Sequence, residues 1–110
     1  MGIIGTGNDN NGRERREDER ARVSLEARWE GMTGRHEARV SDISMGGCFI
    51  DTQGAAELGE LIVFSIKKPD GGWLSLRGEV VSVDPRTGFS VSYTFLTDEE
   101  QQELKRLGTI

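Results

Sequence analysis

One stretch organises the fold of this chain: Val40-Ser41-Asp42-Ile43-Ser44-Met45-Gly46-Gly47-Cys48-Phe49-Ile50. It has apolar residues at both ends, with a carboxylate, two hydroxyls and two adjacent glycines between them. Ser and Asp side chains hydrogen-bond to nearby backbone and glycine tolerates positive φ, so the stretch predicts a tight turn between two strands. Because glycine has no side chain, such a turn also lets a ligand approach the backbone. Composition alone favours the simple turn.

The length and composition predict one domain with a single hydrophobic core. The chain has 110 residues, of which 30% are charged and 35% hydrophobic. No apolar run approaches the roughly 20 residues of a membrane helix, and the start of the chain is too short and too polar for a signal peptide. The single cysteine excludes an internal disulfide. We therefore expect no membrane segment and a reducing compartment, the cytoplasm.

The charge of the chain is acidic overall but unevenly distributed. The formal net charge of −5 argues against broad binding to a nucleic acid polymer, which needs a basic surface. Arginines gather between Arg13 and Arg22, whereas acids dominate the predicted last helix. This distribution favours a small anionic ligand over a polyanion.

The hydrophobic pattern predicts six or seven short strands. Apolar and polar residues alternate over 23–30, which is typical of a half-buried strand. Further strands are predicted over 35–43, 48–52, 61–66, 73–84 and 89–95. The alternation slips near Gly78 or Val80, which predicts a β-bulge of the kind that bends a strand in a closed barrel. We expect Phe89, Val91, Tyr93 and Phe95 to line one face of the last strand.

A helix is predicted after the last strand. Thr97-Asp98-Glu99-Glu100 forms a capping box, and Leu104 and Leu107 form a narrow apolar stripe. The expected fold class is mainly β: a small antiparallel β-barrel of six to seven strands, with the C-terminal α-helix lying against it.

The chain divides into a tail and a folded domain. Residues 1–12 are rich in Gly and Asn and predict a flexible tail, followed by a domain over 13–110. Within it, 13–22 is a charged arm with no apolar face to hold a helix. The barrel is expected over 23–96 and the helix over 97–107.

Catalysis has little support in the residue types present. His36 and Cys48 are the one histidine and the one cysteine, so they form the one possible Cys–His pair. Cys48 is expected to be a small buried hydrophobe, and His36 a solvated side chain at a strand start. A zinc site needs about four N or S ligands. We therefore expect no enzyme, no metal and no cofactor.

The arginine-rich arm has two interpretations. Arg16 and Arg20 lie four residues apart, with Arg15 and Arg22 close by. Interleaved acids make a solvated charge run the ordinary interpretation. The functional interpretation is an anion clamp, because guanidinium groups bind phosphate in bidentate fashion, read the edge of guanine and stack on purine rings.

An arginine-rich arm, an Asp-x-Ser-x-x-Gly turn between strands, a small barrel and a terminal helix together resemble the PilZ domain. The resemblance covers roughly residues 13–107. Asp42, Ser44 and Gly47 match the Asp/Asn-x-Ser-x-x-Gly motif. Residues 16–20 match the Arg-x-x-x-Arg motif, and the strand beginning at Gly88 with the acidic helix after it is similar to the end of the family's domain.

The spacing of the arginines departs from the family pattern. In the family the second arginine commonly stands directly before the first strand, a place that Arg22 holds here. The residue four before Arg22 is Asp18. We take Arg16 and Arg20 as the pair, with Arg15 and Arg22 as further candidates.

The resemblance implies that the ligand is cyclic di-GMP, held singly or as an intercalated dimer. The arm's arginines would contact phosphates and guanine edges, and Asp42 would accept from a guanine N–H or orient an arginine. Ser44 would donate to a phosphate or cap the turn, and Gly47, with Gly46, would let the ligand reach the backbone. Binding would fold the arm over the barrel and form a surface for a downstream protein partner.

Two other functions remain open. In the first, the chain is a PilZ-like module that binds no nucleotide and acts by protein contact, a function that the irregular arginine spacing allows. Alternatively, the barrel binds single-stranded nucleic acid, with Trp29, Trp73 and Tyr93 as stacking platforms. The alternation places at least two of these rings on inward faces, which disfavours the last function.

Overall fold

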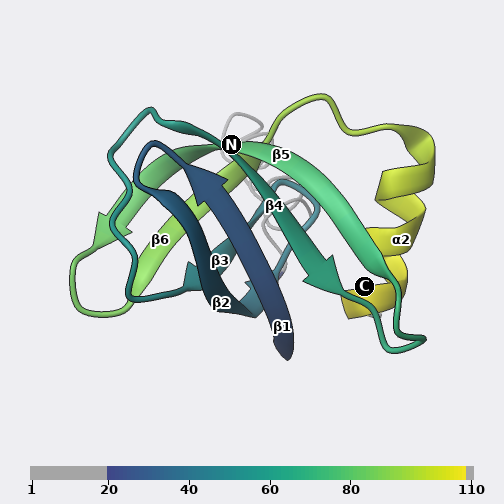
Figure 1. The fold of residues 1–110 in the computed structure, drawn as a ribbon. Coiled ribbons are helices and arrows are strands. Elements are labelled where there is room, and N and C mark those ends of the chain that lie inside the picture. The colour runs from purple at the N-terminus through teal and green to yellow at the C-terminus, as the bar shows by residue number, and fades with distance from the viewer. Residues whose placement is uncertain (1–19, 109–110) are drawn as a thin grey trace, which may run out of the picture.

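The computed structural model describes residues 20–108, and Figure 1 shows a barrel with one helix beside it. The strands are β1 (Ala21–Gly31), β2 (Gly34–Ile43), β3 (Gly47–Asp51), β4 (Leu61–Lys67), β5 (Trp73–Asp84) and β6 (Gly88–Tyr93), and the helix is α2 (Asp98–Gly108). Every pairing is antiparallel, in the order β1-β2-β3-β6-β5-β4, and β4 pairs with β1 to close the barrel. The predicted fold class is confirmed, with six strands in the described part of the chain.

The barrel interior is filled by the alternate side chains of the strands. The largest completely buried side chains come from all six strands and from α2: Trp29, Phe64, Phe89, Ile43, Ile50, Ile66, Leu76 and Leu104. Burying each such side chain stabilises the fold by roughly 1.5–3 kcal/mol. The helix lies beside β5 in Figure 1, and its Leu104 has no exposed surface.

Charged side chains on the outer face of β1 and β2 support the register of the barrel. The register places Glu26 opposite Arg39 and Glu30 opposite Arg35, so unlike charges face each other. Between these pairs, Arg28 opposes Glu37. Such pairs stabilise a sheet by roughly 0.2–1 kcal/mol each, and a one-residue slip would bring these side chains to the apolar face.

Three irregularities interrupt the strand pairings. One follows Val80 in β5, which confirms the bulge predicted near this residue. The other two were not predicted. They lie between Arg22 and Leu25 of β1 and between Val40 and Asp42 of β2. Both therefore fall beside the turn that carries Asp42.

The first strand begins earlier than predicted. β1 starts at Ala21, so Arg22 belongs to the strand and not to a separate arm. Ala21 pairs with Ile43 and Arg22 pairs with Asp42, so the sheet continues toward the N-terminus beyond Val23, where the strand was predicted to begin. The predicted tail over 1–12 and most of the arm, including Arg15 and Arg16, lie outside the described residues.

The sequence predicted the start of α2 correctly but not the end of β6. The capping box is confirmed: Glu100 N donates to Thr97 Oγ1 at 3.1 Å, and Thr97 N donates to Glu100 Oε1 at 3.0 Å. The placement of Phe95 on the inner face is wrong. β6 ends at Tyr93, and Phe95 is 86% exposed with φ 55°. The chain turns toward the helix at this point, so the alternation stops.

No helix within residues 20–108 combines the length and the apolar character needed to cross a membrane.

Candidate functional site

The turn between β2 and β3 is closed by its own hydrogen bonds. Ser44 is buried, and its Oγ donates to Gly47 O at 3.1 Å and accepts from Gly47 N at 3.2 Å and Gly46 N at 3.3 Å. Ser44 N also donates to Gly47 O at 2.8 Å. Ser44 was expected either to donate to a phosphate or to cap the turn. In the structure it caps the turn.

The two glycines of the turn stand in different surroundings. A Cβ at Gly47 would overlap the carbonyl oxygen of Val91 on β6. Gly46 is exposed, and a Cβ there would meet no atom within 4 Å. Gly47 is thus required by the packing of β3 on β6, and Gly46 is the position at which the backbone is open to a ligand.

Asp42 is the point where the arm and the turn meet. Arg20 Nη1 donates to Asp42 Oδ1 at 2.8 Å, with 49% of the Arg20 side chain and 30% of the Asp42 side chain exposed. Arg22 lies directly opposite Asp42 in the pairing of β1 with β2. Arg20 therefore contacts the carboxylate and Arg22 lies at the neighbouring position on β1, and both arginines are exposed.

A third arginine near the turn was missed in the sequence. Arg39 is exposed on β2, and its Nη1 donates to Ser24 Oγ at 3.3 Å. Ser24 lies inside the β1 irregularity next to Arg22, so Arg39 reaches the same part of the surface. Its place three residues before Asp42 was the available signal, but its reach toward Ser24 depends on the register of two strands.

Tyr93 joins the turn to the last strand. Its hydroxyl donates to Gly47 O at 2.9 Å and its backbone N donates to Gly46 O at 3.0 Å. Burial raises the pKa of Tyr93, and the neighbouring Cys48 raises this pKa further. The phenol therefore stays protonated and keeps donating to the turn.

The Cys48–His36 pair has the wrong surroundings for catalysis. Cys48 is buried, as predicted, and this burial raises the pKa of its thiol to about 12, so the nucleophilic thiolate is scarce near neutral pH. His36 is only partly exposed, and the expectation of a solvated ring is wrong. It stacks on Trp29 with 4.4 Å between ring centroids, and its Nε2 is 2.7 Å from Thr33 Oγ1.

The aromatic residues considered as stacking platforms are engaged in the fold. Trp29 is buried in the core, and Trp73 is covered by the Arg28 guanidinium at 3.9 Å from its ring centroid. Tyr93 is bonded to the turn. Within residues 20–108, no group of three or more His, Cys, Asp or Glu side chains is arranged to hold a metal ion. The features of the described surface that suit a ligand are therefore the arginines and the open turn.

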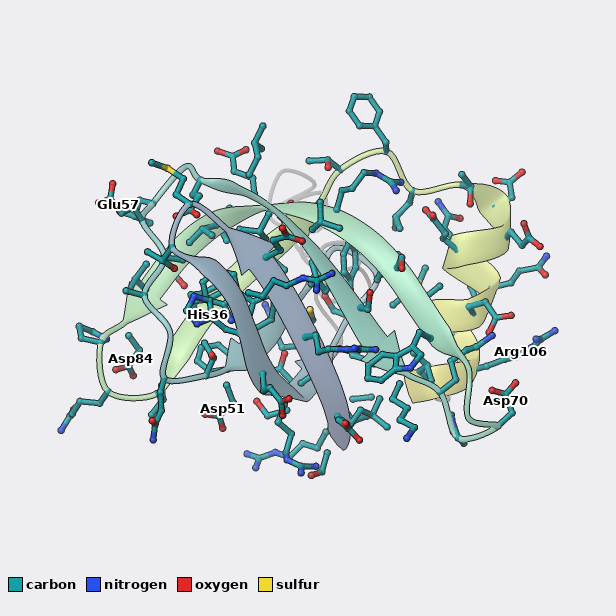
Figure 2. All side chains as sticks on the ribbon, in the orientation of Figure 1. His36, Asp51, Glu57, Asp70, Asp84 and Arg106 are labelled. Atoms are coloured by element: carbon teal, nitrogen blue, oxygen red, sulfur yellow. The ribbon has the colours of Figure 1, made fainter. Side chains whose placement is uncertain are left out.

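Figure 2 shows charged side chains projecting from the barrel, among them Asp51, which opposes Arg39 across β2 and β3. Arg20, Arg22 and Gly46 are exposed and Asp42 is partly exposed, so the site is an open surface. It combines arginines with the Asp42 carboxylate and a rigid turn, and guanidinium groups are the side chains that bind anions in bidentate fashion.

Comparison with known proteins gives a family and a set of similar folds. A family model described as "PilZ domain" matches residues 14–108. No curated protein matches the chain. Among solved structures, the inhibitor of motility MotI/DgrA of Bacillus subtilis has a TM-score of 0.68 at 18% identity, over 79% of this chain and 46% of that chain. The chain thus spans less than half the length of that protein.

Two similar structures are themselves isolated domains. The PilZ domain of CeSA from a cellulose-synthesizing bacterium has a TM-score of 0.66 at 18% identity, over 82% of this chain and 94% of that chain. The PilZ domain of YcgR from Escherichia coli, solved with c-di-GMP, has a TM-score of 0.64 at 15% identity, over 82% of this chain and 86% of that chain. At these identities the likeness concerns the fold.

Proposed function

The chain belongs to the PilZ domain family, and from this membership we propose that it is a receptor for cyclic di-GMP. The observation that supports the proposal most is the 2.8 Å contact between Arg20 and Asp42, because it brings an arginine of one motif to the carboxylate of the other. The YcgR domain of similar fold was solved with the same nucleotide. The chemistry of the surface agrees with a doubly charged purine ligand.

The charges around the turn favour an anion. Arg20 and Arg22 lie at Asp42, the one carboxylate of the turn, so guanidinium groups outnumber carboxylates there. Arg39 is nearby, opposite Glu26 and Asp51 in the strand pairings. Cyclic di-GMP is a dianion with two guanines, and guanidinium groups bind both its phosphates and the Hoogsteen edge of guanine. Each such charge-assisted hydrogen bond contributes about 1.5–3 kcal/mol. A few of them, less the entropy of ordering the arm, reach a free energy near −8 kcal/mol, about micromolar affinity.

The turn supplies shape and its carboxylate supplies orientation. Asp42 orients Arg20 and accepts from a guanine N–H, while the ligand approaches the backbone at the open Gly46. Ser44 and Gly47 hold the turn in place. Arg15 and Arg16, from the preceding part of the arm, contact the phosphates, with the nucleotide bound singly or as an intercalated dimer.

The proposed role is signalling by binding, without catalysis. The ligand orders the arginine-rich arm against the barrel, and the surface formed in this way is recognised by a downstream protein partner. The compartment is cytoplasmic, in keeping with the free, buried thiol of Cys48.

Titration calorimetry with cyclic di-GMP tests the proposal. The wild-type protein should bind with about micromolar affinity, and Arg16→Ala, Arg20→Ala and Asp42→Ala should each weaken binding. Arg86→Ala is a charge-matched control, because Arg86 is exposed in the turn between β5 and β6. Binding that survives the first three changes would mean that the site lies elsewhere.

A second candidate function is a protein-interaction module that binds no nucleotide. The observation that favours it is the spacing of the arginines, because the residue four before Arg22 is Asp18 and not an arginine. The absence of both heat and thermal shift with cyclic di-GMP would support this second function over the first.

A further inference from the structure

Phe95 is displayed on the surface by a strained backbone. It is 86% exposed, and its φ of 55° lies in the left-handed region, which bulky side chains rarely adopt. Among the described residues it is the sole non-glycine with positive φ. The left-handed backbone is unfavourable for an L-residue, and exposure of the ring forgoes the stabilisation that its burial would give. Strain of this kind is concentrated at functional positions.

The strained residue is clamped on both sides. Thr94 N donates to Arg77 O at 2.9 Å, and Arg77 Nη2 donates to Phe95 O at 2.7 Å. The same Nη2 lies 3.3 Å from Glu100 Oε1, which also accepts from Thr97 N in the capping box. Phe95 is therefore tied to β5 and to the first turn of α2, so its ring is presented on a fixed backbone.

Two exposed aliphatic side chains lie on the same outer face. Leu61 and Val63 are outward-facing residues of β4, and Val63 is directly opposite Arg77 in β5. Since Arg77 binds the Phe95 carbonyl, Arg77 lies between Val63 and Phe95 on this face. We call Leu61, Val63 and Phe95 the apolar patch.

Acidic side chains border the apolar patch. Glu79 is opposite Leu61, and Asp98 and Glu99 occupy the first turn of α2, three and four residues after Phe95. All three carboxylates are exposed. Of the nearby cations, Arg77 is paired with Glu100, and Arg35, which lines a hollow with Val63, is paired with Glu30. The surface is therefore complementary to a partner that has apolar side chains and a basic rim.

We propose that the apolar patch docks a basic amphipathic helix of a protein partner, with Phe95 as the central anchor. Helices that insert an apolar face into such a surface bind through a few anchors, and aromatic anchors carry much of the binding energy. The proposal does not depend on nucleotide binding, because none of the three patch residues belongs to the nucleotide site.

Fluorescence anisotropy with a labelled amphipathic peptide of leucine and lysine tests the proposal. Phe95→Asn removes the ring but suits the left-handed backbone, so the variant should fold, as thermal unfolding will check. It should bind the peptide about tenfold more weakly than wild type. Met32→Gln is the matched control, since Met32 is 83% exposed at another turn, and it should bind as wild type does.

Two results would overturn the proposal. Equal binding by wild type and Phe95→Asn would show that the peptide is held by net charge alone. Sedimentation velocity of the protein without peptide gives the second check. A dimer that Phe95→Asn converts to monomer would mean that the patch is occupied by a second copy of the chain.

Discussion

The turn from Asp42 to Gly47 and the arginines beside it carry the two motifs of the proposed site, yet the structure treats them differently. Ser44 and Gly47 are buried and committed to hydrogen bonds and packing within the barrel. Arg20 is half exposed and holds one ion pair. The difference indicates that the buried residues of the turn maintain its shape, whereas the exposed arginines are the groups available to bind a ligand. Changes in the turn should lower stability, and changes in the arginines should lower affinity.

The largest effect should come from Gly47→Ala. The added Cβ would overlap the Val91 carbonyl, and because this is backbone, relief requires β3 to separate from β6. We expect a loss of about 3 kcal/mol or more in the free energy of unfolding, measured by urea denaturation. Gly46→Ala is the matched control and should change stability by less than about 0.5 kcal/mol. Equal stability of the two variants would break the distinction.

Arg20→Ala and Arg22→Ala should show the opposite behaviour. Each should weaken cyclic di-GMP binding by about 1.5–3 kcal/mol, roughly ten- to a hundredfold in Kd. The unfolding free energy should change by less than about 1 kcal/mol, because the Arg20–Asp42 pair is partly exposed to solvent. Calorimetry and urea denaturation on the same samples separate the two effects. A large loss of stability in either variant would contradict the comparison.

Ser44→Ala should lower the free energy of unfolding by less than Gly47→Ala does, and it should leave ligand affinity largely unchanged. The change leaves the Gly46 and Gly47 N–H groups without their side-chain acceptor. We expect a loss of about 1–2 kcal/mol in unfolding free energy. Ser82→Ala, at an exposed position of β5, is the control and should be nearly neutral. If Ser44→Ala weakened cyclic di-GMP binding without lowering the unfolding free energy, Ser44 would be a ligand-binding residue like the arginines.

The smallest effect concerns Glu60, which directly precedes β4 and contacts the turn between β1 and β2. Glu60 accepts from Met32 N at 2.7 Å and from Glu57 N at 2.9 Å, and these bonds lower its pKa below the ordinary value of 4.5. Its contribution is therefore full above pH 4.5 and is lost as the pH falls through the lowered pKa. Glu60→Gln should make unfolding by acid less steep and leave Kd at neutral pH unchanged. An unchanged acid profile would contradict this assignment.

Local patterns predicted most of the fold. Alternation over 23–30 and the long strand 73–84 reported which side chains are buried, and the capping box at Thr97 reported where the helix begins. These signals depend on neighbours in sequence. Phe95 continued the alternation of β6 but lies outside it, because the backbone turns toward α2 and Arg77 holds its carbonyl.

The site was harder to predict than the fold. The pairing of Arg20 with Asp42 agrees with the expected convergence of arm and turn. The clash that makes Gly47 necessary comes from β6, and the reach of Arg39 comes from its register with β1. Both features depend on which strands are neighbours in the barrel, and a short stretch of sequence does not indicate this.

The most direct test of the central claim is a nuclear magnetic resonance titration of the protein with cyclic di-GMP. The account predicts that the guanidinium signals of Arg20 and Arg22 and the backbone amides of Asp42 and Gly46 shift together, with one affinity. Shifts confined to other faces of the barrel, with these four unchanged, would contradict it.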